Sequence, residues 1–252
     1  MVTRLIVATL GERPSLRATL ASIAKQKITD LEVKIVCPLQ KLEKVQGIAQ
    51  ECLSSNFELI QDSGKGLSAA INQGYEAPGV FDYFSWLNDD DELTIKSLER
   101  AINFLEVNKN MCAVIGTLGY MRKDKNKVLL NRATKWNLVI SKFGPNVITQ
   151  PGSLIRRTSI CEKKPLNEGY KYAMDLDLWL TIMKSGKIGI INDTQAIMNW
   201  HQDSITVSNR KKASIEAFRI RLNHSHNLTS KLLVIICYLP TRLLSSLLSK
   251  IN

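Results

Sequence analysis

The sequence predicts an α/β protein: a doubly wound, mostly parallel sheet with helices on both faces, followed by a C-terminal helical extension. Two observations carry this prediction. Short apolar, β-branched runs alternate with segments of helical periodicity through the first two-thirds of the 252 residues, an order typical of parallel strands joined by helices. No internal repeat, low-complexity segment or interdomain linker interrupts the alternation, and a chain of this length can bury a substantial core in one domain.

The first elements follow from apolar runs and from the residues that stop them. Residues 5–8 predict a buried strand, which ends at a turn in residues 11–14. Apolar residues at helical spacing then predict a helix over 16–23. Residues 33–36 predict a second strand, and Pro38 stops it.

The middle of the chain continues the alternation. Residues 41–53 predict a helix, 57–60 a third strand, and 68–75 a helix that follows a glycine turn. Residues 83–87 predict a fourth strand. That strand runs directly into residues 88–91, which are Asn-Asp-Asp-Asp.

Beyond these aspartates the pattern is uneven. A clear apolar stripe predicts a helix over 98–105, and residues 112–115 predict a strand. Periodicity is weak from 119 to 147. Residues 175–183 then predict a helix and 188–191 a further strand.

We expect one domain over 1–206 and a basic, amphipathic helical extension over 207–252. The apolar run in residues 231–252 is shorter than the roughly 20 residues that span a bilayer, and Pro240 interrupts it. Leucine pairs at helical spacing between Lys and Arg favour a helix on a membrane interface. Packing of that helix on the domain or on a partner subunit explains the same pattern, so both interpretations stay open.

Composition narrows the class of protein. The chain is 44% hydrophobic and 23% charged, as in ordinary soluble globular proteins. Its five cysteines are odd in number, scattered and without a CxxC pair, which argues against a disulfide framework and a structural zinc site. The first apolar run is too short for a secretory signal. We therefore expect a protein of the cytoplasm, with peripheral contact at the inner face of the membrane as the hypothesis for its tail.

The formal net charge of +11 suggests an anionic partner. No zinc-finger spacing, RNA-binding aromatic motif or glycine-loop motif accompanies the charge, so we do not expect a nucleic acid. A membrane surface or a phosphate-bearing substrate is the better prediction.

The strongest local signal is the run Asp89, Asp90 and Asp91. It follows a buried strand, and ligands of open α/β sheets bind at the carboxyl ends of the strands. Massed carboxylates repel one another unless a cation neutralises them, and Mg²⁺ prefers oxygen ligands. A solvated acidic turn that opens a helix from Thr94 explains the same run.

Asp175 is the second signal. Its neighbours at helical spacing are apolar, whereas Asp177 lies off that stripe with Thr181 and Lys184. A carboxylate on the inward face of a first helical turn is placed to accept a proton in a cleft. The alternative interpretation is a helix cap.

The order of the motifs resembles family 2 glycosyltransferases of the GT-A fold. Residues 5–13 are similar to the family's first strand and nucleotide loop, residues 20–26 to its "L-x-S-I-x-x-Q" segment, and residues 66–74 to its "G-x-S-x-A-x-N-x-G" segment. Residues 86–91 resemble the metal-binding segment and residues 150–157 the acceptor-side segment. Residues 174–180 are similar to the "E-D-x-D-L-W-L" helix, and residues 201–206 to a late "H-x-x-S-x-T" element. The resemblance covers roughly residues 3 to 206.

The resemblance implies an inverting transfer from a nucleoside diphosphate sugar to a hydroxyl of a glycan or lipid-linked glycan, as in bacterial surface polysaccharide synthesis. Asp175 would be the general base, and Mn²⁺ or Mg²⁺ would bind Asp90, Asp91 and His201. The acceptor would contact Gln150 and Trp179. The nucleotide sugar would contact Thr9, Glu12, Arg13, Gly66, Asn72, Asp89 and Arg156.

The sequence departs from the family pattern in three places. Asn88 replaces the first carboxylate of the metal motif, and Met174 replaces the glutamate before the base. Cys37 and Pro38 stand where many relatives have aspartates that read the nucleobase, so the choice among UDP, GDP and dTDP donors stays open. The competing functions are nucleotidyl transfer, which lacks its glycine-rich, lysine-bearing loop here, and a non-catalytic membrane-surface module.

Overall fold

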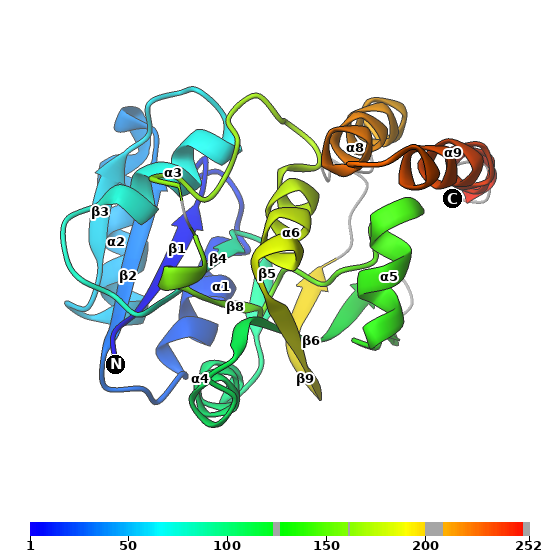
Figure 1. The fold of residues 1–252 in the computed structure, drawn as a ribbon. Helices are drawn as coiled ribbons and strands as arrows, with labels where there is room; N and C mark the ends of the chain where they lie inside the picture. Colours follow the sequence, from blue (N-terminus) through cyan, green and yellow to red (C-terminus); the bar gives the residue numbers. More distant parts are fainter. Residues whose placement is uncertain (123–126, 161, 200–208, 249–252) are drawn as a thin grey trace.

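A computed structural model describes residues 1–122, 127–160, 162–199 and 209–248. Within these residues one nine-stranded sheet has the order β3-β2-β1-β4-β8-β6-β9-β5, and β7 pairs with β6 outside that path. The strands are β1 (Thr3–Ala8), β2 (Leu31–Cys37), β3 (Glu58–Gln61), β4 (Tyr83–Asn88), β5 (Asp91–Leu93), β6 (Met111–Arg122), β7 (Lys127–Asn131), β8 (Leu154–Arg156) and β9 (Lys187–Asn199). Figure 1 shows the strands between two layers of helices.

The parallel half of the sheet aligns the ends of its strands. β1 pairs in parallel with both β2 and β4, and β2 pairs in parallel with β3. Ala8, at the end of β1, lies opposite Val36 on one side and Asn88 on the other. The loops that follow β1, β2 and β4 therefore leave the sheet at one edge.

The other half mixes directions. β8 lies antiparallel between β4 and β6, β6 and β9 are parallel, and β5 adds to β9 in antiparallel register. The predicted α/β class and mostly parallel sheet are confirmed. Strands β5, β7 and β8 were not predicted, because each has five residues or fewer and shows little periodicity; β5 and β8 are also defined by partners distant in sequence.

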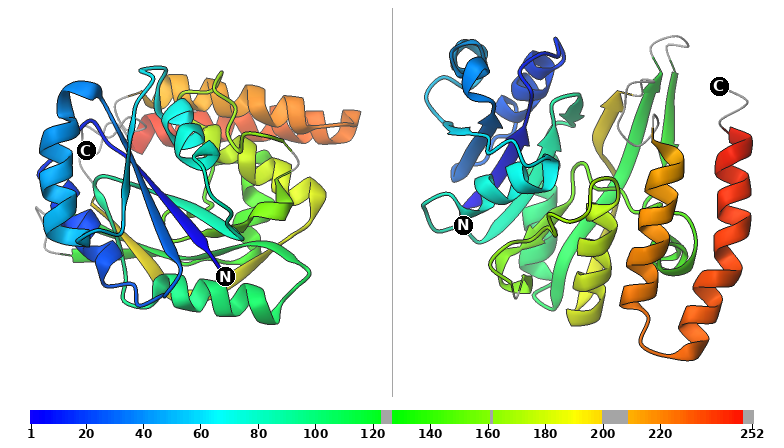
Figure 2. Two further views of the ribbon diagram at one scale, coloured as in Figure 1. Left: turned by 90° about the vertical axis from the view of Figure 1, so that its left-hand side faces the viewer. Right: turned by 90° about the horizontal axis from the view of Figure 1, so that it is seen from above.

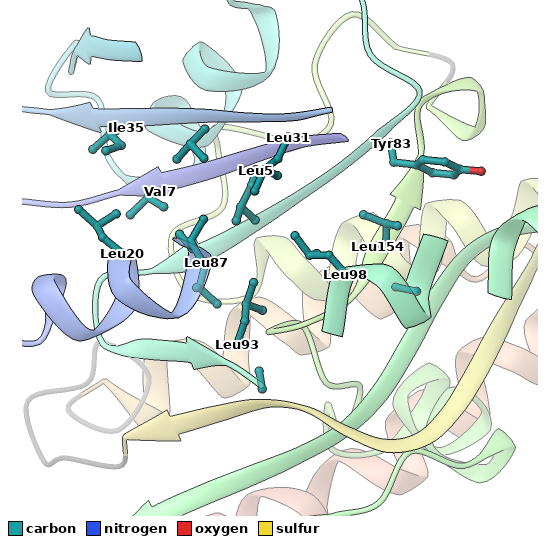
Figure 3. Packing of buried hydrophobic residues seen from close by; sticks show 14 of the residues in the cluster. Leu5, Val7, Leu20, Leu31, Ile35, Tyr83, Leu87, Leu93, Leu98 and Leu154 are labelled. Atoms are coloured by element: carbon teal, nitrogen blue, oxygen red, sulfur yellow. The ribbon is translucent and has the colours of Figure 1, made fainter. Parts of the chain in front are cut away.

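Helices cover both faces, as predicted. The helices are α1 (Leu16–Ala24), α2 (Leu42–Leu53), α3 (Leu67–Glu76), α4 (Ser97–Val107), α5 (Lys135–Phe143), α6 (Met174–Ser185), α8 (Arg210–His224) and α9 (Leu228–Leu248). Side chains alternate across a strand, so Val7 of β1 faces Leu20 of α1, whereas Ile6 packs with Ile71 of α3. Figure 3 shows the first of these clusters, in which Leu98 of α4 joins the same apolar layer.

The last two helices extend the helical layer that contains α6, on the other face of the sheet from α1 and α4 (Figures 1 and 2). Ile220 of α8 packs against Leu176 and Leu180 of α6. Helices α8 and α9 run antiparallel, and the rings of Phe218 and Tyr238 lie 4.3 Å apart between their centroids. Among the described helices, none combines the length and the apolar character that crossing a membrane requires.

Candidate active site

Thr9 joins the loop after β1 to the acidic run after β4. Its Oγ1 donates to Asp89 Oδ2 at 2.6 Å and accepts from the backbone N–H of Gly11 at 2.9 Å. Gly11 has φ +69°, and a Cβ there would lie 2.9 Å from Cβ of Lys41. Glycine is therefore required at this turn on both conformational and steric grounds.

Arg13 lies between two of the aspartates. Its Nη1 donates to Asp89 Oδ1 at 3.0 Å and to Asp90 Oδ2 at 2.7 Å. The Arg13 side chain is 37% exposed, so it reaches over the acidic run from the solvent side. One cation thus offsets part of the repulsion between neighbouring carboxylates.

Asp91 differs from its neighbours, because it begins strand β5 and is 1% exposed. Its Oδ2 accepts from Asn88 Nδ2 at 3.1 Å, whereas Oδ1 has no partner among the described residues. Burial, reinforced by the Asp90 carboxylate, raises the pKa of Asp91 well above its ordinary value. The alternative of a solvated turn that opens a helix from Thr94 is thereby corrected: the run enters a buried strand, and helix α4 begins at Ser97.

Asp175 lies in the first turn of α6, as predicted. Leu178 and Trp179, the next residues on its face, are 2% and 0% exposed, and Asp177 faces elsewhere to contact His224 Nε2 at 2.7 Å. Asp175 Oδ2 accepts from Asn146 Nδ2 at 3.0 Å. Burial raises the pKa of Asp175, which brings its titration closer to neutral pH.

Two cavities of about 520 Å³ each meet at this point. The first, which we name the N-terminal cavity, is lined by the loop after β1 and the start of α3, including Thr9, Glu12, Arg13, Asp62, Gly66, Trp86 and Asp89. The second, the C-terminal cavity, is lined by the loop before β8 and by α8 and α9, including Asp91, Asn146, Ile148, Arg210, Phe218, Arg221 and Tyr238. Both cavities share Asn88, Asp90, Gln150, Tyr172 and Asp175. A carboxylate pair, Asp90 and Asp175, therefore lies at the junction of the two spaces.

Most of the residues singled out in the sequence line these cavities, and Gln150 is held there because its Nε2 donates to the carbonyl of Trp86 at 2.7 Å. Arg156 does not line them. At the opposite end of β4 its Nη2 donates to Leu105 O at 2.7 Å and its Nη1 to Tyr83 Oη at 2.9 Å. The expectation of a nucleotide contact is thus corrected: Arg156 stabilises the sheet.

Asn72 and Trp179 are also corrected to structural positions. Asn72 is 0% exposed, and its side chain holds the loop at Leu166. Its Nδ2 donates to the backbone O of Leu166 at 2.8 Å, and its Oδ1 accepts from the backbone N–H of Leu166 at 3.1 Å. Trp179 is fully buried in the core between α6 and the sheet. His201 lies outside the described residues.

Several cavity residues carried no sequence signal. Asn146 lies in a segment of weak periodicity, and Arg221 lies on α8, where apolar and charged residues show no simple stripe. Asp62 follows β3 and lines the N-terminal cavity near the end of β2. At the end of β2, Cys37 and Pro38 stand where many relatives have aspartates. Its position directly after a strand was the one sequence signal that could have identified Asp62 as a cavity residue.

The carboxylates at the end of β4 supply some, but not all, of the ligands that a hard divalent cation needs. Asp90 and Asp91 both line the C-terminal cavity, and one buried oxygen of Asp91 has no protein partner among the described residues. The part of the chain that the structure describes contains no group of three His, Cys, Asp or Glu side chains that could hold a metal ion. Mg²⁺ commonly uses one or two protein carboxylates together with substrate phosphates, so two carboxylates suffice for that mode of binding.

Comparison with known proteins gives one family match. The model of glycosyl transferase family 2 matches residues 5–161. No curated protein sequence is similar enough to count as a match.

Solved structures share the fold. The chain is similar to residues 1–349 of S. aureus TarS in complex with UDP-GlcNAc, with 15% identity over 93% of this chain and 70% of that chain and a TM-score of 0.68. It is also similar to the mannosyltransferase PcManGT from Pyrobaculum calidifontis in complex with GDP-Man and Mn²⁺, with 13% identity over 96% of this chain and 73% of that chain and a TM-score of 0.67.

Proposed function

Because the chain belongs to glycosyl transferase family 2, we propose that it is an inverting glycosyltransferase that uses a nucleoside diphosphate sugar and Asp175 as its general base. The observation that carries this proposal is the position of Asp175 and Asp90 at the junction of the two cavities. A donor in one cavity and an acceptor in the other would meet between these carboxylates.

The N-terminal cavity suits the donor. Arg13 offers a guanidinium to a diphosphate, and Gly66, with φ +101°, precedes the N-terminus of α3. Asp62 and the end of β2 lie where a nucleobase would be read. The two solved neighbours hold UDP-GlcNAc and GDP-Man, which supports a nucleotide-sugar donor without choosing its base.

A divalent metal is part of the proposal. Asp90 and Asp91 would hold Mn²⁺ or Mg²⁺, with His201 as a further proposed ligand. When bound, the ion supplies positive charge against the departing diphosphate. The neighbour crystallised with Mn²⁺ supports this assignment.

Asp175 would take the proton of the acceptor hydroxyl. The hydroxyl oxygen then attacks the anomeric carbon of the donor sugar, and the bond from that carbon to the diphosphate oxygen breaks on the opposite face. Asn146 holds one oxygen of Asp175 by its 3.0 Å bond and so orients the carboxylate that would accept the proton. Tyr172 and Gln150, which line both cavities, would position the two substrates.

We place the enzyme at the inner face of the membrane in bacterial surface polysaccharide synthesis, with a glycan or lipid-linked glycan as acceptor. On α9, Leu228, Leu232, Ile235 and Ile236 are 74%, 48%, 49% and 65% exposed at helical spacing. The neighbouring α5 exposes a second apolar stripe of Trp136, Val139 and Ile140. Exposed lysines flank both stripes at positions 135, 142 and 231, a combination that favours an anionic bilayer surface.

Calorimetric titration of UDP, GDP and dTDP tests the donor site, each with Mn²⁺ and with EDTA. We expect one nucleotide to bind only with the metal, and Asp90→Asn to weaken it by roughly tenfold or more, since a carboxylate contact to the metal is lost. Asp193→Asn, an exposed aspartate outside both cavities, is the matched control. Failure of a folded wild-type chain to bind any of the three nucleotides would overturn the proposed function.

A further inference from the structure

Arg221 on α8 carries a buried guanidinium that is incompletely satisfied. The residue is 6% exposed. Its Nε donates to the backbone O of Ser141 at 2.9 Å, and its buried Nη2 has no partner among the described residues. Burial lowers the pKa of Arg221 to about 10, so the group stays charged at neutral pH. A buried charge without full hydrogen bonding is unfavourable unless a ligand or water completes it.

The helix that carries Arg221 is firmly attached to the catalytic helix. Glu216, one turn earlier on α8, accepts the backbone N–H groups of Lys171, Tyr172 and Ala173 just before α6, at 2.7–3.1 Å. His224 contacts Asp177 of α6 at 2.7 Å. Helix α8 is therefore held against α6, and Arg221 lines the same cavity as Asp175.

One face of α8 forms a wall of the C-terminal cavity. The lining residues of this face fall at helical spacing and are Arg210, Ala213, Ser214, Ala217, Phe218 and Arg221. Small side chains in the middle leave space, and apolar side chains of Phe143, Ile148 and Val234 complete the walls near Arg221. The cavity therefore combines a positive group with an apolar surface.

We propose that Arg221 binds the phosphate of the acceptor, and that this phosphate is attached to an apolar carrier chain that lies along the cavity. The assignment rests on the proposed function, because it places the acceptor in the cavity that Asp175 lines. A guanidinium fork matches phosphate oxygens in a bidentate way, and a phosphate in the cavity would complete the hydrogen bonding of Arg221 once its buried Nη2 turns toward the cavity. Since Arg221 and Asp175 line the same cavity, the reacting hydroxyl belongs to a sugar close to the phosphate along the acceptor.

Binding of farnesyl diphosphate tests this proposal, with farnesol and inorganic pyrophosphate as the two partial probes. All titrations are made in EDTA, so that a metal on the aspartates does not contribute. We expect farnesyl diphosphate to bind the wild type, and each partial probe to bind about tenfold more weakly or worse. Equal binding of farnesol would overturn the phosphate contact, and equal binding of pyrophosphate would overturn the apolar carrier.

Variants locate the contact. Arg221→Met should weaken farnesyl diphosphate by about tenfold or more, and Arg221→Lys by less, because lysine keeps the charge but loses the fork. Arg219→Met removes an exposed arginine of the same helix and should change nothing. Binding by Arg221→Met or Arg221→Lys that equals the wild type would overturn the proposal, as would no binding to the wild type.

A second titration on the same samples separates this proposal from the proposed function. Arg221 does not line the N-terminal cavity, so nucleotide binding with Mn²⁺ should be unchanged in Arg221→Met. Loss of nucleotide binding in every sample, the wild type included, would overturn the proposed function but would leave the farnesyl diphosphate result as a separate finding. Loss of farnesyl diphosphate binding together with a lower melting temperature in both Arg221 variants would assign Arg221 a structural role and overturn the phosphate site.

Discussion

The hydroxyl of Thr9 connects two loops of the donor side, and its removal is predicted to damage both stability and nucleotide binding. In Thr9→Val the shape of the side chain is kept, but Asp89 Oδ2 loses a 2.6 Å donor and the buried N–H of Gly11 loses its acceptor. A hydrogen bond to a charged group contributes about 1.5–3 kcal/mol and an unsatisfied buried N–H costs about 1–3 kcal/mol. Arg13 still contacts the other oxygen of Asp89, so we expect a total loss of about 2–4 kcal/mol.

Urea unfolding, followed by fluorescence and circular dichroism together, measures this loss. Thr9→Ser is the matched control, because serine keeps the hydroxyl and both of its bonds, and it should stay within about 1 kcal/mol of the wild type. Calorimetry with the nucleotide that binds the wild type gives the second readout, in which Thr9→Val should bind more weakly than Thr9→Ser. A Thr9→Val variant as stable as Thr9→Ser, within about 0.5 kcal/mol, would show that water replaces the hydroxyl and would refute the reasoning.

Three further predictions use other parts of the molecule. Asp175→Asn should lower the rate of nucleoside diphosphate release, measured with a lipid-linked glycan extract, by roughly 10²–10⁴-fold. The folded state raises the pKa of this carboxyl, so the stability of the wild type falls as pH rises from the ordinary aspartate range through the folded pKa. At pH 7 the free energy of unfolding of the variant in urea should therefore equal or exceed that of the wild type. A less stable variant would contradict this. Arg156→Met should cost about 2–4 kcal/mol in the same assay while nucleotide affinity is unchanged, since its partners are sheet and helix groups remote from both cavities. Replacing Ile235 and Ile236 by Ser should weaken sedimentation with anionic vesicles by about tenfold or more, and a change in oligomeric state instead would assign α9 to a partner subunit.

Local patterns were sufficient wherever a residue's environment follows from its own strand or helix. The strand that ends at Asn88 predicted the sheet edge where the aspartates lie, because ligands of such sheets bind at that edge. The apolar neighbours of Asp175 predicted its inward face, because α6 is long and regular. Both predictions depend on periodicity within one element.

Predictions failed where the partner is distant in sequence. Arg156 looked like a phosphate ligand beside Arg157, but its carbonyl partners come from α4 and β6, which no local pattern reveals. Asp91 enters a strand only because β9 pairs with β5 more than 100 residues later, with Asp91 opposite Met198. Short strands of this kind are set by tertiary pairing, since three residues carry too little periodicity to predict them.

The distribution of satisfied charges across the molecule supports the assignment of the site. At the amino ends of the strands, the 0% exposed Arg4 is saturated by Glu32 and by the carbonyls of Tyr75, Ala77 and Pro78. Among the Asp, Glu, Lys and Arg side chains that the structure describes, only Asp91 and Arg221 leave a buried atom without a partner, and both line the C-terminal cavity. A buried polar atom without a hydrogen-bond partner lowers stability. Because the hydrogen bonding of Arg4 is complete, we infer that Asp91 and Arg221 are retained for a partner that the fold itself does not supply. A cation at Asp91 and a phosphate at Arg221 would satisfy both, in the cavity that the base Asp175 also lines.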